Sequence, residues 1–150
     1  MFKKIIATEN SYTTAFLRIS LGLVMFPHGA QKALGWFGGY GFEGTMGFFT
    51  GQMGIPWLFA FLAIAAEFAG SLGLVTGLLS RVAAFGIASV MAVAVLTSHL
   101  GNGFFMNWMG NQKGEGFEYH ILAIALAVAV IVRGSGPLSL DRKLTSSLKS

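Results

Sequence analysis

The residues best suited to chemistry are one carboxylate inside a long apolar run and two basic side chains that precede it. Glu67 is the only charged residue between Pro56 and Leu79. His28 and Lys32 lie four residues apart, so a helix places them on one face. A carboxylate and an imidazole can exchange protons, and an ammonium group can orient an anionic or carbonyl oxygen. Glu67, His28 and Lys32 are therefore the candidate catalytic residues.

A second group of polar residues is predicted to bind a ligand around Glu67. Glu118 and His120 are two positions apart, so on a helix at most one of them can face the centre. Most of these side chains are expected toward the outer half of the membrane, with Glu67 at the floor of the set. The candidates are Arg18, Gln31, His99, Glu118 and His120.

Three interpretations of this polar set remain open at the level of sequence. In the first, Glu67 and Glu118 exchange protons in an outward-facing pocket, and His28 or His99 relays them. In the second, Arg18 or Lys32 neutralises Glu67 and the role is structural. In the third, the histidines and carboxylates bind a transition metal. No HxxxH or ExxH spacing supports the third interpretation, so we predict no metal site, and the absence of cysteine removes thiolate ligands.

The composition predicts a membrane protein. The chain is 54% hydrophobic and 11% charged, whereas soluble domains carry about 25% charged residues. The net charge of +4 does not indicate nucleic-acid binding, because the basic residues lie at the ends of apolar runs. The predicted partner of most of the surface is the lipid bilayer.

Four apolar segments predict an all-α membrane protein that forms an antiparallel bundle of four transmembrane helices in a single domain, residues 1–150. Backbone groups in lipid must be satisfied within the segment, which favours helices. The second and third segments have the clearest length and hydropathy, the first is the least apolar, and the fourth is short. The expected spans are about 12–34, 56–79, 82–100 and 117–132.

Lysine and arginine predict the orientation in the membrane. The positive-inside rule places the more basic side in the cytoplasm, which gives a multi-pass protein of the inner (plasma) membrane with both termini cytoplasmic. The loops Gly35–Ile55 and Gly101–Gly116 then face outside. On the inner side lie Lys3, Lys4, Arg81, Arg133, Arg142, Lys143 and Lys149, and on the outer side Lys32 and Lys113.

Both outer loops are rich in glycine and aromatic residues. The stretch Gly35–Gly54 has eight glycines and six aromatic residues, and Gly101–Gly116 has five glycines with Phe104, Phe105 and Trp108. One interpretation is that the rings settle at the membrane interface and the glycines supply turns. The other is that the loops form an aromatic lid over a flat hydrophobic ligand.

Taken together, the order of these residues resembles the DoxX family over nearly the whole chain. The resemblance is carried by an arginine motif and a His-Gly-x-x-Lys motif in the first helix, a glutamate in the second, and a characteristic tail. The matching stretches are Arg18–Gly22, His28–Lys32, Ala66–Gly70 with Gly73, Gly77 and Arg81, then His99, Glu118 and Gly134–Asp141.

The resemblance implies four transmembrane helices and quinone-linked redox chemistry. DoxD-type relatives form the membrane subunit of a thiosulfate:quinone oxidoreductase, and other DoxX-like proteins are partners of soluble redox proteins. We therefore expect a membrane subunit or accessory protein of a quinone-linked redox system, with no built-in cofactor, in which a quinone or a redox partner protein supplies the electron carrier. Two alternatives are a non-catalytic scaffold of a respiratory or oxidative-stress complex and a small proton-coupled transporter.

Overall fold

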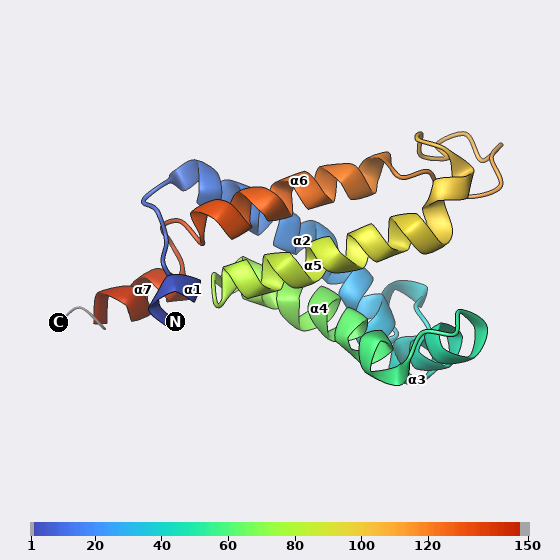
Figure 1. Ribbon diagram of the computed structural model, residues 1–150, viewed down its shortest axis with the longest axis horizontal. Coiled ribbons are helices and arrows are strands. Elements are labelled where there is room, and N and C mark those ends of the chain that lie inside the picture. Colours follow the sequence, from blue (N-terminus) through green and yellow to red (C-terminus); the bar gives the residue numbers. More distant parts are fainter. Residues whose placement is uncertain (1, 148–150) are drawn as a thin grey trace.

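Four long helices form an antiparallel bundle in the computed structural model, which describes residues 2–147 (Figure 1). They are α2 (Tyr12–Leu34), α4 (Trp57–Thr76), α5 (Ser80–Ala94) and α6 (Glu118–Arg133). Helix α2 packs against α4 and α6, and α5 packs against the same two helices. No strand occurs within residues 2–147. The all-α prediction is therefore confirmed for this part of the chain.

Shorter helices complete the two ends of the bundle. Helices α1 (Phe2–Ile5) and α7 (Leu140–Ser147) lie together at one end (Figure 1). At the other end, the connection after α2 folds into η1 (Trp36–Gly38), α3 (Gly41–Gly47) and the π-helical η2 (Phe48–Gln52). Helix α5 continues through η3 (Val95–His99) and η4 (Leu100–Asn102).

The first outer connection is more ordered than the loop predicted at Gly35–Ile55. Met46 is buried with Ala60 and Ile64 of α4, and Phe49 and Ile55 pack against this small cluster. Burial of these apolar side chains stabilises the helical conformation despite the many glycines. The second connection, Gly101–Gly116, has no helix after η4.

The structure has both an apolar outer surface and an apolar core, as expected of a helical bundle in a membrane. Helix α4 and the continuous helix Ser80–Asn102 are long and apolar enough to cross a bilayer. Large side chains such as Phe16, Phe85 and Leu122 point outward. Inside, all four helices contribute to one cluster: Leu21, Met25, Leu74, Ala84, Ile87, Met91, Ala123, Ala127 and Val130.

Helices α4 and α5 approach each other closely from the turn that joins them to about the middle of each helix. A Cβ atom on Gly86 would lie 3.0 Å from the Cβ atom of Ala66, and one on Gly73 would lie 3.5 Å from that of Ala83. Small residues thus permit close approach. Helix α4 ends at Thr76, and Gly77 caps it with φ +73°. Farther from the turn the two helices diverge (Figure 1).

Arg18 stabilises the end of the bundle at which the turn between α4 and α5 lies. Its fully buried guanidinium donates hydrogen bonds to the carbonyl oxygens of Val75 (2.9 Å), Ser135 (2.9 Å) and Leu138 (3.1 Å), and also to that of Leu74. The carbonyls at the end of α4 have no partner within the helix. Arg18 therefore caps α4 and ties it to the segment that follows α6.

Asp141 stabilises the same turn on the side where α5 begins. Its buried carboxylate accepts hydrogen bonds from the backbone N–H of Leu79 (2.8 Å) and of Ser80 (3.0 Å), and from the hydroxyl of Ser135. The negative charge lies at the start of α5, where the helix dipole favours it. Leu79 has a φ of +50°, which is strained for a residue with a side chain, so these bonds stabilise a costly turn.

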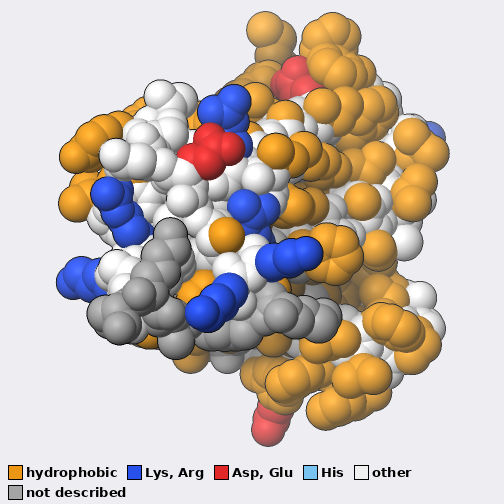
Figure 2. Space-filling model, turned by 60° about the vertical axis from the view of Figure 1, so that its left-hand side comes forward, with side chains coloured by type: hydrophobic (Ala, Val, Ile, Leu, Met, Phe, Trp, Pro, Cys, Tyr) orange, Lys and Arg blue, Asp and Glu red, His pale blue; other side chains and the backbone are white. Residues whose placement is uncertain are grey.

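Lysine and arginine gather at this same end of the molecule (Figure 2). Arg81 donates to the carbonyl oxygens of Ala7 (3.2 Å) and Val132 (3.0 Å), and also to that of Ile131. Arg133 pairs with Glu9 at 3.3 Å. The clustering agrees with the charge asymmetry of the sequence, although Lys149 lies outside the described residues.

Candidate functional site

A large cleft runs along α4 and α5, from the turn that joins them to the residues that follow α5. Its volume is about 1250 Å³, and most of its lining is apolar. Phe59 and Leu62 of α4 and Phe85 and Val93 of α5 line it and are also exposed on the outer surface. The cleft is therefore open sideways, toward the surface that lipid would cover, and a lipid-soluble molecule could enter from the bilayer.

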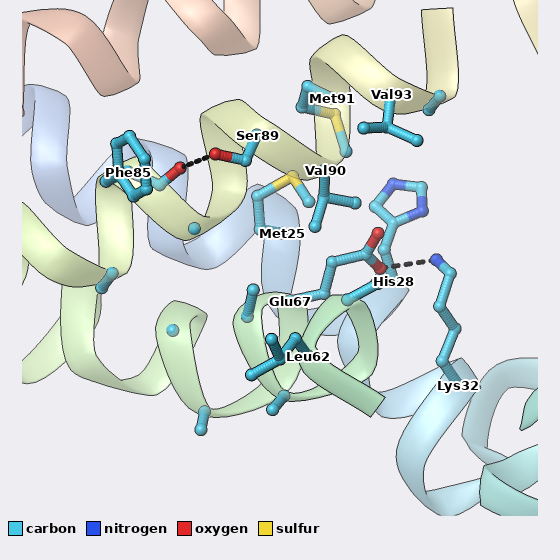
Figure 3. Close-up of a pocket in the computed structure, with 18 of the residues that line it drawn as sticks. Met25, His28, Lys32, Leu62, Glu67, Phe85, Ser89, Val90, Met91 and Val93 are labelled. Atoms are coloured by element: carbon cyan, nitrogen blue, oxygen red, sulfur yellow. Dashed lines mark hydrogen bonds and ion pairs between the residues drawn. The ribbon is translucent and has the colours of Figure 1, made fainter. Parts of the chain in front are cut away.

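Glu67 and Lys32 form an ion pair in the wall of this cleft (Figure 3). Lys32 Nζ lies 2.5 Å from Glu67 Oε2, and the side chains are 27% and 4% exposed, respectively. A carboxylate in an apolar span is costly without a partner. Of the two cations predicted to neutralise Glu67, Lys32 does so, whereas Arg18 bonds to backbone carbonyls elsewhere.

Gly29 sets the distance between the helices that carry this pair. A Cβ atom on Gly29 would lie 2.6 Å from the carbonyl carbon and oxygen of Glu67. No side chain larger than hydrogen fits there without movement of a helix. The close approach places Lys32, one turn farther along α2, within reach of the carboxylate.

His28 completes the polar group on α2, as its spacing from Lys32 predicts. Its ring lies beside the Glu67 carboxylate and lines the cleft (Figure 3). It interacts electrostatically with both Lys32 and Glu67. Met25, one turn earlier on the same face, contributes a thioether to the cleft wall.

Three more aromatic rings continue from His28 across the bundle. The ring of Tyr119 is 6.0 Å from that of His28, the ring of His120 is 5.5 Å from that of Tyr119, and the ring of His99 is 4.1 Å from that of His120. Tyr119, His120 and His99 all line the cleft. Four rings that can each exchange a proton thus form a series from Glu67 toward the connection between α5 and α6.

His120 is the member of this series that has a buried ring nitrogen without a hydrogen-bond partner. It is 6% exposed, and its Nδ1 atom is buried without a hydrogen-bond partner. Buried polar atoms are nearly always paired, so this nitrogen is available to a ligand in the cleft. At the end of the series, His99 Nδ1 lies 2.9 Å from the carbonyl oxygen of Glu115 in the exposed loop.

Gln31 and Glu118, two of the predicted ligand-binding residues, have structural partners instead. Gln31 donates to the carbonyl oxygen of Phe37 at 3.2 Å and so supports η1. Glu118 accepts from the backbone N–H of Met106 at 3.0 Å and from Trp108 Nε1 at 3.4 Å. Neither residue lines the cleft, and nor does Arg18. Of Glu118 and His120, it is His120 that faces the interior.

Tyr119 and Met25 are the site residues that the sequence analysis missed. The phenol of Tyr119 donates to the sulfur of Met25 at 3.3 Å, and it lies within electrostatic reach of Glu67. A signal was present for Met25, since positions 25, 28 and 32 share a helix face. Tyr119 gave none, because a tyrosine at the membrane interface is ordinary.

No group of three or more histidine or carboxylate side chains within residues 2–147 is arranged to hold a metal ion. The arrangement is suited to a different task. The cleft is wide and apolar enough to admit a flat apolar molecule, Lys32 and His28 have hydrogen-bond donors for oxygen atoms of such a molecule, and the rings of the series are of types that can carry protons.

Comparison with known proteins identifies one family and two relatives. The profile of the DoxX family matches residues 13–100. The chain is 32% identical over 128 residues to the Bacillus subtilis (strain 168) protein named "Putative oxidoreductase CatD", covering 85% of this chain and 84% of that protein. It is 33% identical over 135 residues to an uncharacterized protein of Haemophilus influenzae, covering 88% and 90%. No solved structure matches the chain.

Proposed function

Because this chain belongs to the DoxX family of membrane proteins, we propose that it is the membrane component of a quinone-linked redox system. The observation that carries the proposal is the Lys32–Glu67 ion pair in the wall of a wide apolar cleft that opens sideways. The relative named as an oxidoreductase supports the same class of chemistry.

The cleft and its polar wall fit a quinone well. Pockets for small molecules commonly measure about 300–1,000 Å³, so a cleft of about 1250 Å³ has room for a ring and part of an isoprenoid tail. Leu62, Val90 and Met91 offer an apolar surface to such a ring (Figure 3). Lys32 and His28 supply donors for a quinone oxygen.

Reduction of a quinone to a quinol consumes two electrons and two protons. In our proposal the electrons come from a redox partner protein, while Glu67 and His28 deliver protons to the quinone oxygens. Lys32 orients the nearer oxygen and pairs with the Glu67 carboxylate once Glu67 has given up its proton. The rings of Tyr119, His120 and His99 reload Glu67 and His28 with protons from the outer loop.

The remaining sequence expectations belong to the same proposal. All four long helices cross the inner membrane, with the basic end in the cytoplasm and the cleft nearer the outer face. The exposed Tyr40, Trp108 and Met109 of the outer connections, each at least 85% exposed, lie at the interface or contact the redox partner.

Quinone binding by the purified protein tests the proposal. A short-chain ubiquinone and a short-chain menaquinone would be titrated against the full chain in detergent, by calorimetry. We expect saturable binding of at least one of them that weakens at least tenfold in Glu67→Gln. Arg133→Gln, which alters an exposed ion pair at the opposite end, is the matched control and should bind normally. Absence of binding to either quinone contradicts the proposal.

A further inference from the structure

A second, smaller crevice lies at the basic end of the bundle, and it shares Val82 and Phe85 with the near end of the cleft. Its volume is about 360 Å³, and α1, α5 and α6 all contribute to it. Lys4 and Arg81 stand at its rim, and Ile5, Val82, Phe85 and Ile131 line the rest. Two cations thus border an apolar groove at one end of the bundle.

The apolar part of this crevice continues along the outside of α5. Val82 is 52% exposed and Phe85, one turn farther, is 65% exposed. At least half of the surface of each of these residues has no protein cover among residues 2–147. An acyl chain laid along them would bury apolar surface next to the two cations.

The cations at the rim retain binding capacity. Arg81 uses Nε and Nη1 for backbone carbonyls, which fixes the plane of its guanidinium, and Nη2 remains without a partner within the described part of the chain. Lys4 is exposed and has no ion pair or hydrogen bond there. By contrast, Arg133 is paired with Glu9 and Arg142 with Asn10.

We propose that this crevice binds an anionic phospholipid, with the phosphate at Lys4 and Arg81 and one acyl chain along Val82 and Phe85. Basic pockets between helices at the membrane surface are suited to such head groups. A guanidinium held in place by backbone carbonyls recognises a phosphate at low entropic cost. The bound lipid would join α1 to the α5–α6 pair. Lys4, Ile5, Arg81 and Ile131 lie outside the quinone cleft, whereas Val82 and Phe85 line both the crevice and the cleft. The proposal does not depend on the proposed redox function.

Native mass spectrometry of the full chain tests the proposal. The protein in detergent would be titrated with phosphatidylglycerol or with phosphatidylcholine of the same acyl chains. We expect preferential retention of phosphatidylglycerol. In Lys4→Gln its affinity should fall about fivefold, the effect of one basic residue near a phosphate. Lys143→Gln removes the same charge from the same end outside the crevice and should bind like the wild type.

Further arms of the experiment distinguish a lipid from a free anion. Inorganic phosphate and glycerol phosphate at millimolar concentration should not displace phosphatidylglycerol, because neither occupies the groove. Phe85→Ala should weaken retention of the lipid with Lys4 intact. The proposal is overturned if the two lipids bind equally, if Lys4→Gln has no effect, if Lys143→Gln is equally damaging, or if inorganic phosphate competes fully.

Discussion

Gly29 of α2 approaches Glu67 of α4 so closely that a Cβ atom would lie 2.6 Å from the backbone of Glu67. Gly29→Ala should therefore separate the helices and lengthen the Lys32–Glu67 contact. Overpacking of this kind costs about 1–3 kcal/mol, which thermal unfolding in detergent would measure. Gly47→Ala is the control, since nothing lies within 4 Å of its Cβ position. An unchanged melting temperature in Gly29→Ala would show that the helices can move apart freely.

Removal of Lys32 should be more damaging than removal of both members of the pair. Lys32→Met leaves the buried carboxylate of Glu67 unpaired, a defect of about 3–5 kcal/mol, whereas Lys32→Met with Glu67→Leu removes the unpaired charge and should recover most of the stability. Denaturant unfolding of the wild type, the two single variants and the double variant gives the coupling energy. Arg133→Gln breaks an exposed pair and should cost about 0–1 kcal/mol. Additive effects of Lys32→Met and Glu67→Leu would mean that the pair contributes nothing.

Arg18 should prove structural, with no direct part in quinone binding. Arg18→Leu leaves several buried carbonyl oxygens without donors, each worth about 1–3 kcal/mol, so we expect a large loss of thermal stability. Arg18→Lys cannot replace the planar guanidinium and should recover only part of it. Quinone affinity of the folded Arg18→Lys fraction should stay within about threefold of the wild type, an effect below about 1 kcal/mol. A loss as large as that of Glu67→Gln would place Arg18 at the ligand.

Tyr119→Phe should separate proton delivery from quinone binding. The change removes one hydroxyl whose bond is to the weak acceptor Met25, so stability should change by less than about 1 kcal/mol. We expect normal quinone affinity but quinone-dependent turnover lowered about tenfold or more, the smaller end of general acid–base effects, with a larger solvent deuterium effect. Tyr40→Phe, on an exposed loop residue, is the control. Full activity in Tyr119→Phe would exclude the phenol from the proton route.

The positions of the helices were largely predictable, because hydropathy and family motifs are both read from short local stretches of the sequence. Helix α2 occupies Tyr12–Leu34, as the apolar pattern indicates, and the resemblance to the DoxX family is confirmed. Helix α4 ends earlier than predicted, at Thr76 instead of Leu79, because Gly77 adopts a left-handed conformation. An apolar run does not reveal where within it a glycine will terminate the helix.

The site was predictable only in part, because its remaining contacts depend on tertiary packing. Lys32 and His28 share a face with fixed spacing, so their proximity follows from the helix. The partners of Arg18 are backbone carbonyls, which carry no sequence signature. The neighbours of Tyr119 depend on how α6 is rotated against α2, and hydropathy leaves that rotation undetermined among small apolar side chains.

The carboxylate that secures the turn between α4 and α5 has a consequence for biosynthesis. Asp141 follows all four long helices in the chain, yet its bonds to Leu79 and Ser80 stabilise a turn made much earlier. During translation the α4–α5 hairpin therefore forms before Asp141 is available, and water takes the place of the carboxylate at these two N–H groups in the interim. The hairpin matures only after α6 has been inserted and the segment containing Asp141 has left the ribosome. Chains that stop short of Asp141 would contain all four long helices but lack the carboxylate that stabilises the α4–α5 turn, and we expect proteases to degrade them faster than the full chain.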